Sequence, residues 1–464
     1  MKQKMLKEGK MQMFSEWIRR NGFWILDGLK GSKVRKHLKD IEFIMENIND
    51  LRVKEIQDNY LKQILIYAKE KVPFYKGVNY TDLKSFPIVN KSIMKESYKD
   101  FQSLDFLDKK VIELHTSGST GIPFAVRQDL NKRNRVYAEM MYFWEKAGFK
   151  IGMKYIYFRI WTDGNRKSKT DAWARNIIMH DILRTDKENL ESVREVLKTQ
   201  RKIKMLIGYA STFDLITTYL NNHGDTPEMF SIKTILSSAE LLPESTRRKL
   251  KSVFGCNVVS LYSNQENGTL AQECIENTEF HLNTASYYFE FLKFDKDEPA
   301  ELNEPARIVV TDLFNHAMPL IRYDTGDIAL LKEHCDCGWN TKAVKVVQGR
   351  VLDCIYDTLG RVICPNTVTV YMWPFDKLLQ FQFIQEDEKD YLIKLNGDKG
   401  IYDDNEIINV FKGVLGQDAK IRVEYVDEIP VLYSGKRKHV VCNYKPLNQN
   451  RGEDKQYACC INRS

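Results

Sequence analysis

Hydrophobic and polar positions follow two different periods along this chain. Between Lys33 and Tyr67 the apolar residues recur at helical spacing, and Val72-Pro73-Phe74-Tyr75 interrupts the pattern. From about residue 111 to about residue 330, short apolar runs are followed by polar or amphipathic stretches that read as helices. The runs are Tyr155 to Phe158, Met205 to Ile207, Thr234 to Leu236 and Val258 to Leu261. This alternation predicts an α/β domain with largely parallel strands.

The pattern becomes denser in strands after residue 282 and changes again near Gly349-Arg350-Val351-Leu352-Asp353. Strands are predicted at Tyr287 to Phe294, Arg307 to Thr311 and Asp327 to Leu331. Beyond residue 353 the sequence predicts a small α+β unit. Its elements are a hairpin (Cys354 to Ile363), strands at Phe381 to Ile384, Tyr391 to Leu395 and Ile421 to Val426, and a helix at Asn405 to Val414.

The chain has 464 residues, which is too long for one hydrophobic core. We therefore expect an α/β protein whose large, multi-layer amino-terminal domain contains parallel-rich sheets. A small, mobile α+β domain follows it. The expected segments are a helical region (1–100) packed on the large domain, the rest of that domain (101–350), the small domain (351–445) and a flexible tail (446–464).

Composition narrows the class of protein. With 43% hydrophobic and 29% charged residues the chain is typical of globular proteins. Its net charge of +7 suits anionic ligands such as nucleotides, but no run of like charges indicates a nucleic-acid-binding arm. No segment reaches the roughly 18 apolar residues of a membrane span. Nine cysteines without an export signal favour reduced thiols, so we expect a cytoplasmic protein.

The first thirty residues contain an amphipathic stretch with Met13, Trp17, Phe23 and Trp24. Such a helix can lie on a membrane surface or pack against the protein's own core. Packing against the core is the commoner arrangement, and it is what we expect here.

The stretch most informative about chemistry is His115-Thr116-Ser117-Gly118-Ser119-Thr120-Gly121-Ile122-Pro123. It lies between a predicted strand (Val111 to Leu114) and a polar segment that reads as a helix. Its glycines allow a sharp turn, and its hydroxyls and backbone N–H groups can hold phosphate oxygens. No Gly-Lys-Ser/Thr ends it, so it is not a Walker A loop. The sequence thus indicates a nucleotide held by hydroxyls, with a cation supplied from elsewhere.

Two further segments follow predicted parallel strands, whose carboxyl ends commonly bind ligands in α/β domains. Ser237-Ser238-Ala239-Glu240 comes after one apolar run and Tyr262-Ser263-Asn264-Gln265-Glu266-Asn267-Gly268 after another. In the second, Tyr262 could stack on a base and Glu266 could hold Mg²⁺. The alternatives are a simple strand-to-helix turn and a polar loop.

Two more segments complete the set. In Arg322-Tyr323-Asp324-Thr325-Gly326-Asp327, the Asp327 carboxylate could accept hydrogen bonds from ribose hydroxyls, although the residues also suit a β-turn. In Pro430 to Lys438, Ser434-Gly435-Lys436 offers a flexible turn with a cation. The alternative is that the Lys-Arg-Lys run at residues 436–438 is simply part of the solvated surface, as exposed runs of this kind usually are.

The order and spacing of these segments, with Gly349-Arg350-Val351-Leu352-Asp353 between the last two, carry a resemblance. The chain resembles the adenylate-forming superfamily of acyl-CoA synthetases, peptide-synthetase adenylation domains and luciferases. Within it, the chain is similar to the phenylacetate–CoA ligase branch, which includes capsule-biosynthesis homologues. The resemblance runs from about Val72 to Val441.

The resemblance implies two half-reactions. ATP and a carboxylic acid give an acyl-adenylate and pyrophosphate, with Mg²⁺ as cofactor. An acceptor, often coenzyme A, then displaces AMP. It also implies residue roles. The Thr116 to Gly121 loop would hold the pyrophosphoryl part of ATP through Ser117, Ser119 and Thr120, Ser238, Ala239 and Glu240 would line the adenine and acyl region, and Tyr262 would pack on adenine. Glu266 would bind Mg²⁺, Asp327 the ribose, Arg350 the ribose or a phosphate, and Lys436 the carboxylate and the α-phosphate, while Asp353 would be the hinge.

The chain departs from the superfamily pattern in several places. Gln265 replaces the usual Ser or Thr before the glutamate, Ser263 replaces a glycine, and Phe124 stands where many relatives have lysine. Gln265 can still donate to a phosphate oxygen, so altered contacts are expected. Lys438 is close enough to Lys436 to substitute for it.

Cys274-x6-His281 and Cys335-x-Cys337 together supply a Cys₃His set, which is typical of structural Zn²⁺. The two pairs flank the strands predicted between 282 and 332, so a metal would tie the ends of that unit together. Some members of the branch carry zinc in this region. The alternative is ordinary reduced cysteines and a surface histidine.

Three functions remain open at this point. The first is an adenylating ligase that passes a small acyl group to coenzyme A. The second is an adenylating enzyme that acylates an amine or hydroxyl of a cell-surface polysaccharide precursor. The third is a nucleotide-binding pseudoenzyme scaffold. Candidate side chains for the acyl pocket are Phe158, Trp161, Tyr209 and Phe213, which suit an aromatic or apolar acid.

Overall fold

In the computed structural model of the protein, the chain forms two compact units. Unit 1 comprises residues 1–290, 309–325 and 331–346, and unit 2 comprises residues 291–308, 326–330 and 347–464. The structure describes residues 2–116, 124–159, 161, 165–182, 187–294, 296–332, 335–339, 341–348, 355–360, 362–363, 368, 371–372, 374–375, 377–430 and 438–444.

Unit 1 begins with helices whose ends are set by polar caps. They are α1 (Lys2–Leu29), α2 (Lys33–Glu46), α3 (Leu51–Lys71) and α4 (Lys91–Glu96). The Asp27 carboxylate accepts hydrogen bonds from the backbone N–H groups of Val34 and Arg35, both at 3.0 Å, and so caps α2 from the preceding helix. Helix α3 ends at Lys71, directly before the Val72-Pro73 interruption that the sequence predicts.

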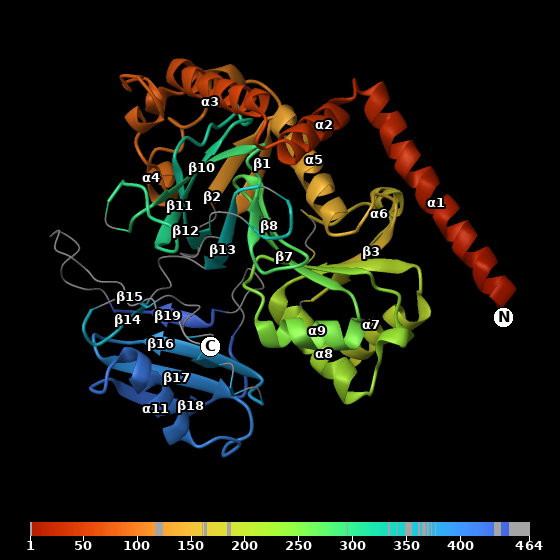
Figure 1. The fold of residues 1–464 in the computed structure, drawn as a ribbon, viewed down its shortest axis with the longest axis vertical. Coiled ribbons are helices and arrows are strands. Elements are labelled where there is room, and N and C mark those ends of the chain that lie inside the picture. The colour runs from red at the N-terminus through yellow and green to blue at the C-terminus, as the bar shows by residue number, and fades with distance from the viewer. Residues whose placement is uncertain are drawn as a thin grey trace. The chain divides into compact units, whose positions relative to one another are not determined.

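Five parallel strands form one end of the main sheet, and two of them, β3 and β7, are labelled in Figure 1. They lie in the order β4-β3-β5-β6-β7, with β4 at the edge. Their bounds are β3 (Lys154–Arg159), β4 (Ile177–Asp181), β5 (Ile203–Gly208), β6 (Thr234–Ser238) and β7 (Asn257–Asn264). All but β4 match the apolar runs predicted to be strands. The prediction of an α/β fold with a large, parallel-rich sheet is confirmed.

Strands β5 and β6 are almost entirely buried because both faces of the sheet are covered there. On one face, Ile235 and Phe158 pack with α7 (Lys187–Thr199), α8 (Ala210–Asn222) and α9 (Glu244–Phe254). On the other face, Leu236 packs with Trp144 of α5 (Leu130–Lys146). A short helix, α6 (Lys169–Arg175), connects β3 and β4.

Two predicted strand-to-helix connections are hairpins instead. The hydroxyl-rich segment follows β1 (Ile112–Thr116) and precedes β2 (Phe124–Gln128), and these strands pair antiparallel from Ile112↔Gln128 to Thr116↔Phe124. Helix α5 starts only after Asp129, whose carboxylate caps it. The expectation of a helix directly after the segment was wrong because residues 124–128 pair with β1 at five consecutive positions, a tertiary contact that no local pattern predicts.

The second hairpin joins β7 to β8 (Gly268–Glu273), which pair antiparallel. The sheet continues antiparallel from β8 to β9 (Phe280–Leu282) and on to β13 (Ala343–Gln348). The expectation of a helix after the Val258 to Leu261 run is therefore wrong. Strands β10 (Tyr287–Leu292), β11 (Pro305–Asp312) and β12 (Tyr323–Lys332) overlap the three predicted in this region.

The carboxyl-terminal part of unit 2 contains a separate small α+β domain, as predicted. Strands β14 (Ile355–Tyr356) and β15 (Val362–Ile363) form the expected hairpin. A four-stranded sheet has the order β18-β17-β16-β19, and Phe383, Ile393 and Phe411 lie in its core. The elements are β16 (Gln380–Gln385), β17 (Asp390–Asn396), α11 (Asp404–Leu415), β18 (Lys420–Tyr425) and β19 (Val440–Cys442). Strand β19, parallel to β16, had no counterpart in the sequence-based prediction.

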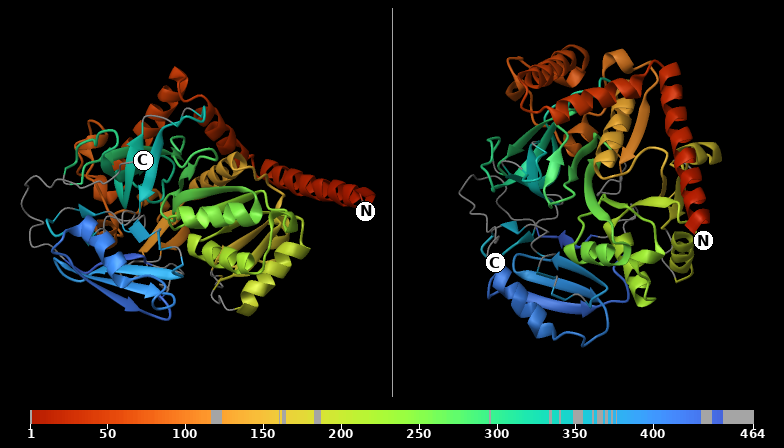
Figure 2. Two further views of the ribbon diagram at one scale, coloured as in Figure 1. Left: turned by 60° about the horizontal axis from the view of Figure 1, so that its bottom comes forward. Right: turned by 45° about the vertical axis from the view of Figure 1, so that its right-hand side comes forward.

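Helix α1 lies on the outside of unit 1 in both views of Figure 2. Phe23 and Trp24 pack against the core that α2 and α5 share, but Met13 and Trp17 are exposed. The expectation that this stretch packs against the core thus holds for its second half and is wrong for its first. In the part of the chain that the structure describes, no helix is long and apolar enough to cross a membrane.

Candidate functional site

The structure brings two of the predicted segments together at one edge of the sheet. Strands β6 and β7 are adjacent and parallel, with Ser238 paired to Leu261. The Ser238 to Glu240 turn and Tyr262 therefore lie side by side at the carboxyl ends of their strands. This is the edge at which α/β domains bind ligands.

The turn after β6 is held in a specific conformation. Ala239 has φ 66°, a left-handed conformation that is rare for a residue with a side chain. The Glu240 carboxylate accepts hydrogen bonds from the backbone N–H and the hydroxyl of Ser211, at 2.8 and 3.2 Å. Tyr209, at the N-cap of α8, makes no side-chain capping bond, so Glu240 supplies the cap from the neighbouring turn.

Glu266 is buried beside a lysine that sequence reasoning missed. Its Oε1 atom lies 3.3 Å from Nζ of Lys91 and 3.4 Å from the hydroxyl of Tyr323. Lys91 is the first residue of α4, which Asn90 caps through the N–H groups of Ser92 and Ile93. Because Lys91 and Glu266 are 175 residues apart, no local pattern could have paired them.

The arginine of the Arg322 to Asp327 segment has a structural role that places Lys91. The buried Arg322 guanidinium pairs with Glu290 at 2.9 and 3.0 Å and donates to the carbonyl oxygen of Phe86 at 3.1 Å. Backbone hydrogen bonds join Val89 to residues 322 and 324 on either side of Tyr323. These contacts fix the segment that leads into α4 and hence the position of Lys91. Tyr323 onward is strand β12, so the β-turn alternative is not what the chain adopts.

Buried side chains hold the backbone of the turn that carries Glu266. The side-chain amide of Gln128 donates to the carbonyl oxygen of Glu266 at 3.0 Å. The hydroxyl of Tyr287 donates to the carbonyl oxygen of Asn267 at 2.9 Å. The N–H of Thr269 donates to Glu139 Oε2 at 3.2 Å. The backbone of the turn is therefore fixed at several points.

A buried charge cluster stands behind these contacts. Nζ of Lys132 lies 2.8 Å from Asp312, 3.0 Å from the Tyr287 hydroxyl and 3.8 Å from Glu139. Burial raises the pKa of the Glu139 carboxyl group, and the positive charge of Lys132 acts in the opposite direction and lowers it. Charged groups this deep require near-complete pairing, and the cluster achieves it by linking α5 to β10 and β11. The sequence offered no signal for it, because its members come from three separated segments.

Replacing Gly268 tests how tightly the turn is held. At φ 132°, a Cβ there would lie 2.7 Å from Glu139 Oε2 and 2.9 Å from the Tyr287 hydroxyl. We expect Gly268→Ala to lower the free energy of unfolding by about 3 kcal/mol, from backbone strain and overpacking together. Gly224→Ala is the control, because its φ is 66° but its Cβ would meet nothing within 4 Å. Equal losses in chemical denaturation would contradict the role given to the cluster.

Two of the four candidate acyl-pocket residues belong to the hydrophobic core instead. Phe158 and Phe213 are fully buried and pack edge to face, with ring centroids 6.0 Å apart. Tyr209 is half-buried after the end of β5, and Trp161 lies just beyond β3. The guanidinium of Arg159 lies 5.3 Å from the Trp161 ring, a cation–π distance. Arg159 was not predicted from the sequence.

The remaining predicted residues are placed as follows. Tyr262 lies within β7, and its hydroxyl is 3.4 Å from that of Thr325. The side chain of Gln265 is exposed, and Thr116 is the last residue of β1. Asp327 lies in β12 and belongs to unit 2. Outside the described residues fall Ser117, Gly118, Ser119, Thr120, Gly121, Arg350, Asp353 and Lys436.

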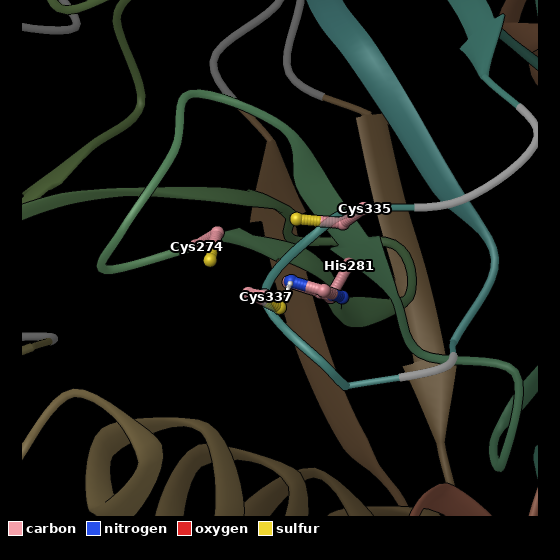
Figure 3. A group of neighbouring side chains, drawn as sticks. All are labelled: Cys274, His281, Cys335 and Cys337. Carbon is pink, nitrogen blue, oxygen red and sulfur yellow. Dashed lines mark hydrogen bonds between the residues drawn. The ribbon is translucent and has the colours of Figure 1, made fainter.

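The four predicted metal ligands converge (Figure 3). The thiols of Cys274, Cys335 and Cys337 and a ring nitrogen of His281 all lie within 4.8 Å of one another. In a tetrahedral zinc site the ligand atoms are about 3.5–3.8 Å apart, so a small contraction would complete the geometry. His281 comes from β9 and Cys274 directly follows β8, while the other two lie before β13. The alternative of a surface histidine is wrong, because His281 is fully buried.

Neighbouring groups orient these ligands as they do in known metal sites. Nδ1 of His281 is hydrogen-bonded to the Thr341 hydroxyl at 2.6 Å, which leaves Nε2 directed at Cys337, 3.4 Å away. The backbone N–H of Trp339 donates to the Cys337 thiol and the Asn277 amide donates to Cys335. Burial lowers the pKa of His281 to about 4, which keeps the imidazole neutral.

The fold is shared with acyl-CoA ligases of known structure. A solved structure of 2-hydroxyisobutyryl-CoA ligase in the postadenylation state matches with a TM-score of 0.70 at 14% identity, over 86% of this chain and 91% of that one. ATP-bound MatB from Rhodopseudomonas palustris matches with a TM-score of 0.52 at 14% identity, over 70% and 66%. At these identities the likeness concerns the fold alone.

Sequence relatives define the class more closely. Protein CapK of Staphylococcus aureus is 25% identical over 444 residues, 90% of this chain and 94% of that protein. The phenylacetate–coenzyme A ligase of Thermus thermophilus is 25% identical over 337 residues, 67% of this chain and 73% of that enzyme. Residues 355–443 match the family model of the CapK C-terminal domain. The predicted resemblance to the phenylacetate–CoA ligase and capsule branch is confirmed, and the relatives include acid–CoA ligases, the enzyme class that the sequence predicts.

Proposed function

We propose that this protein activates a small carboxylic acid with ATP, forms an acyl-adenylate and passes the acyl group to coenzyme A. The observation that carries the proposal is the buried Glu266, fixed beside Lys91 at the ligand-binding edge of the sheet. Relatives named as phenylacetate–coenzyme A ligases and the fold support it.

The proposed roles follow the predicted residues. The Thr116 to Gly121 loop holds the phosphates, Ser238 to Glu240 and Tyr262 receive the adenine, and Asp327 and Arg350 bind the ribose. Asp353 is the proposed hinge and Lys436 the cation for the α-phosphate. Two orphaned polar groups suit a nucleotide site: among the described residues, the Asn267 amide and the Ser237 hydroxyl are buried and lack hydrogen-bond partners.

Glu266 fits a role as Mg²⁺ ligand. Its contacts in the described part of the chain all involve Oε1, so Oε2 remains for a cation. Magnesium commonly takes one or two carboxylates and completes its shell with water and substrate phosphates. When bound, it would neutralise phosphate charge. Lys91 would then hold the other carboxylate oxygen in place.

The acyl group is proposed to bind near the carboxyl ends of β3 and β5. With Phe158 and Phe213 assigned to the core, Tyr209 and Trp161 remain as aromatic walls. Nε of Arg159 is buried and has no hydrogen-bond partner among the described residues, so a polar group on the acid could satisfy it. An aromatic acid with a polar substituent suits this combination better than a plain alkyl chain.

A second function differs only in the acceptor. Here the acyl group goes to an amine or hydroxyl of a cell-surface polysaccharide precursor. The similarity to CapK along 94% of that protein, together with the CapK C-terminal domain match, favours this alternative. The pseudoenzyme alternative has only the altered Gln265 in its support.

Pyrophosphate exchange distinguishes the three. The purified protein is incubated with ATP, labelled pyrophosphate and a panel of carboxylic acids, and AMP release is then measured with and without coenzyme A. We expect acid-dependent exchange and AMP release that requires coenzyme A. Exchange without that requirement would favour the polysaccharide acceptor. Tight ATP binding without any exchange would leave only the pseudoenzyme scaffold among the three functions.

We further propose that the Cys274, His281, Cys335 and Cys337 tetrad binds a structural Zn²⁺. The convergence of four ligand atoms with an oriented imidazole supports it. We expect about one zinc per chain when protein purified without chelators is analysed by plasma mass spectrometry. Less than half an equivalent would exclude the proposal. The domain boundaries and the cytoplasmic location given above stay predictions.

A further inference from the structure

Helix α1 packs against unit 1 with its polar face. Gln12, Glu16, Arg20 and Asp27, together with Phe23, recur at helical spacing along that face. Glu16 and Asp27 are buried, which is unusual for acidic side chains on a surface helix.

Specific contacts fix this orientation. The Gln12 amide donates to the carbonyl oxygen of Lys202 at 3.1 Å, and the Arg20 guanidinium donates to that of Ile151 at 3.0 Å. The helix approaches so closely at Gly152 that a Cβ there would lie 2.3 Å from the carbonyl oxygen of Glu16. The face that α1 turns toward the body is therefore defined by backbone approach as well as by side chains.

The opposite face is apolar and exposed. Met11, Phe14, Ile18, Ile25 and Leu29 form one stripe at spacings of three, four and seven residues. Together with three further large apolar residues of α1, they are between 48% and 80% exposed. The three are Met13, Trp17 and Leu26. A surface helix normally has the reverse polarity, so this stripe calls for a partner.

Charge distribution identifies the partner. Residues 1–36 contain ten Lys and Arg but three Asp and Glu, which is a net charge of +7. The whole chain also carries +7, so residues 37–464, with sixty of each sign, carry none. The apolar stripe lies between four lysines in residues 2–10 and the exposed Lys30, Lys33, Arg35 and Lys36. All of the net positive charge thus flanks the exposed apolar surface.

We propose that α1 binds the surface of an anionic lipid bilayer. Its Met, Phe, Trp, Ile and Leu side chains enter the boundary between headgroups and acyl chains, and the flanking cations contact anionic headgroups. Apolar burial and electrostatic attraction are the two terms that hold amphipathic helices at membranes. A second copy of the chain suits the stripe less well, because its own α1 would bring an equal positive charge against the first.

Vesicle cosedimentation with the full-length protein tests this binding. We expect binding to vesicles of phosphatidylglycerol and phosphatidylcholine, little binding to phosphatidylcholine alone, and weaker binding as salt rises from about 0.1 to about 0.5 M. The measurement does not depend on ATP or on any acid, so it is independent of the proposed ligase activity.

Matched variants locate the binding surface. The triple variant Phe14→Gln, Ile18→Gln, Ile25→Gln should lower the partition coefficient at least about 100-fold. Its melting temperature should stay unchanged, because these side chains are exposed. The control is Leu51→Gln, Leu104→Gln, Leu302→Gln, which removes three exposed leucines outside α1 and should bind as wild type.

The charge term has its own pair of variants. Lys30→Gln, Lys33→Gln, Lys36→Gln should weaken binding by about fivefold per lysine. The control changes the exposed Lys251, Lys296 and Lys399 to glutamine and should have a much smaller effect.

Three results would overturn the proposal. The first is no binding to anionic vesicles at low salt. The second is binding that the α1 variants leave unchanged, which would place the contact on another surface. The third is a wild-type protein that does not bind vesicles but is a dimer in light scattering, while the apolar triple variant is a monomer. That result would assign the stripe to a second copy of the chain.

Discussion

Replacing Lys436 with alanine should lower acid-dependent ATP–pyrophosphate exchange by about 10²–10³-fold, the loss typical of removing one transition-state charge donor. The Thr116 to Gly121 loop lacks the lysine of a Walker A motif, so the proposed site needs a cation from elsewhere. Attack on ATP by the carboxylate places negative charge on the α-phosphoryl oxygens. A lysine delivered to a water-excluded site stabilises that charge most strongly.

Lys438→Ala is the matched control for this prediction. The carbonyl oxygen of Lys438 accepts a hydrogen bond from the Gln382 side chain at 2.9 Å, just before β19, and its side chain is half-exposed. Because that anchor uses the backbone, alanine should keep it, and exchange should fall little. Binding of ATP, measured separately by calorimetry, should change much less than the rate for Lys436→Ala. If Lys438→Ala shows the large loss instead, the alignment of this segment is wrong.

Removing one ligand of the tetrad should have the second large effect. For Cys335→Ser we expect zinc content to fall from about one equivalent to near zero. The melting temperature of the zinc-loaded protein should exceed that of the variant by roughly 10 °C, since a structural zinc contributes several kcal/mol to stability. The physical reason is that the metal joins β9 and the end of β8 to the segment before β13.

Cys256→Ser is the control for the metal. Cys256 is a free, half-buried cysteine outside the tetrad, and burial raises its pKa to about 12. The same chemical change there should leave zinc content at the wild-type value. Equal zinc content in Cys335→Ser and Cys256→Ser would show that the tetrad is not the zinc-binding site. Dialysis of wild type against a strong chelator should reproduce the stability loss of Cys335→Ser.

The sequence predicted the parallel strands well because their environment is uniform. Ile235 and Leu236 point to opposite faces, and each meets a helical layer, so the strand reads as an unbroken apolar run. It predicted β8 and β2 poorly, because each follows a polar stretch of sequence and has few large apolar residues. In both cases antiparallel pairing with the preceding strand, a tertiary interaction, decided the structure.

The candidate site divides in the same way. Ser238, Tyr262 and Glu266 could be predicted because each follows or ends an apolar run and carries recognisable chemistry. Lys91 and Glu139 could not, because their importance depends on side chains more than a hundred residues away. Phe158 and Phe213 were assigned to a pocket on residue type alone, and burial on the helix-covered face of the sheet places them in the core.

The polar face with which α1 packs against the rest of unit 1 has a thermodynamic consequence. Up to Arg20, α1 meets the body through hydrogen bonds such as that of Gln12, worth about 0.5–1.5 kcal/mol net, and that of the charged Arg20, worth about 1.5–3 kcal/mol. Water can replace these bonds, so lifting this part of the helix would uncover a hydrophilic patch at a modest cost in free energy. Phe23 and Asp27 would keep the second half attached through the core and the α2 cap. We therefore expect the first part of α1 to detach and return reversibly while the rest of the protein remains folded.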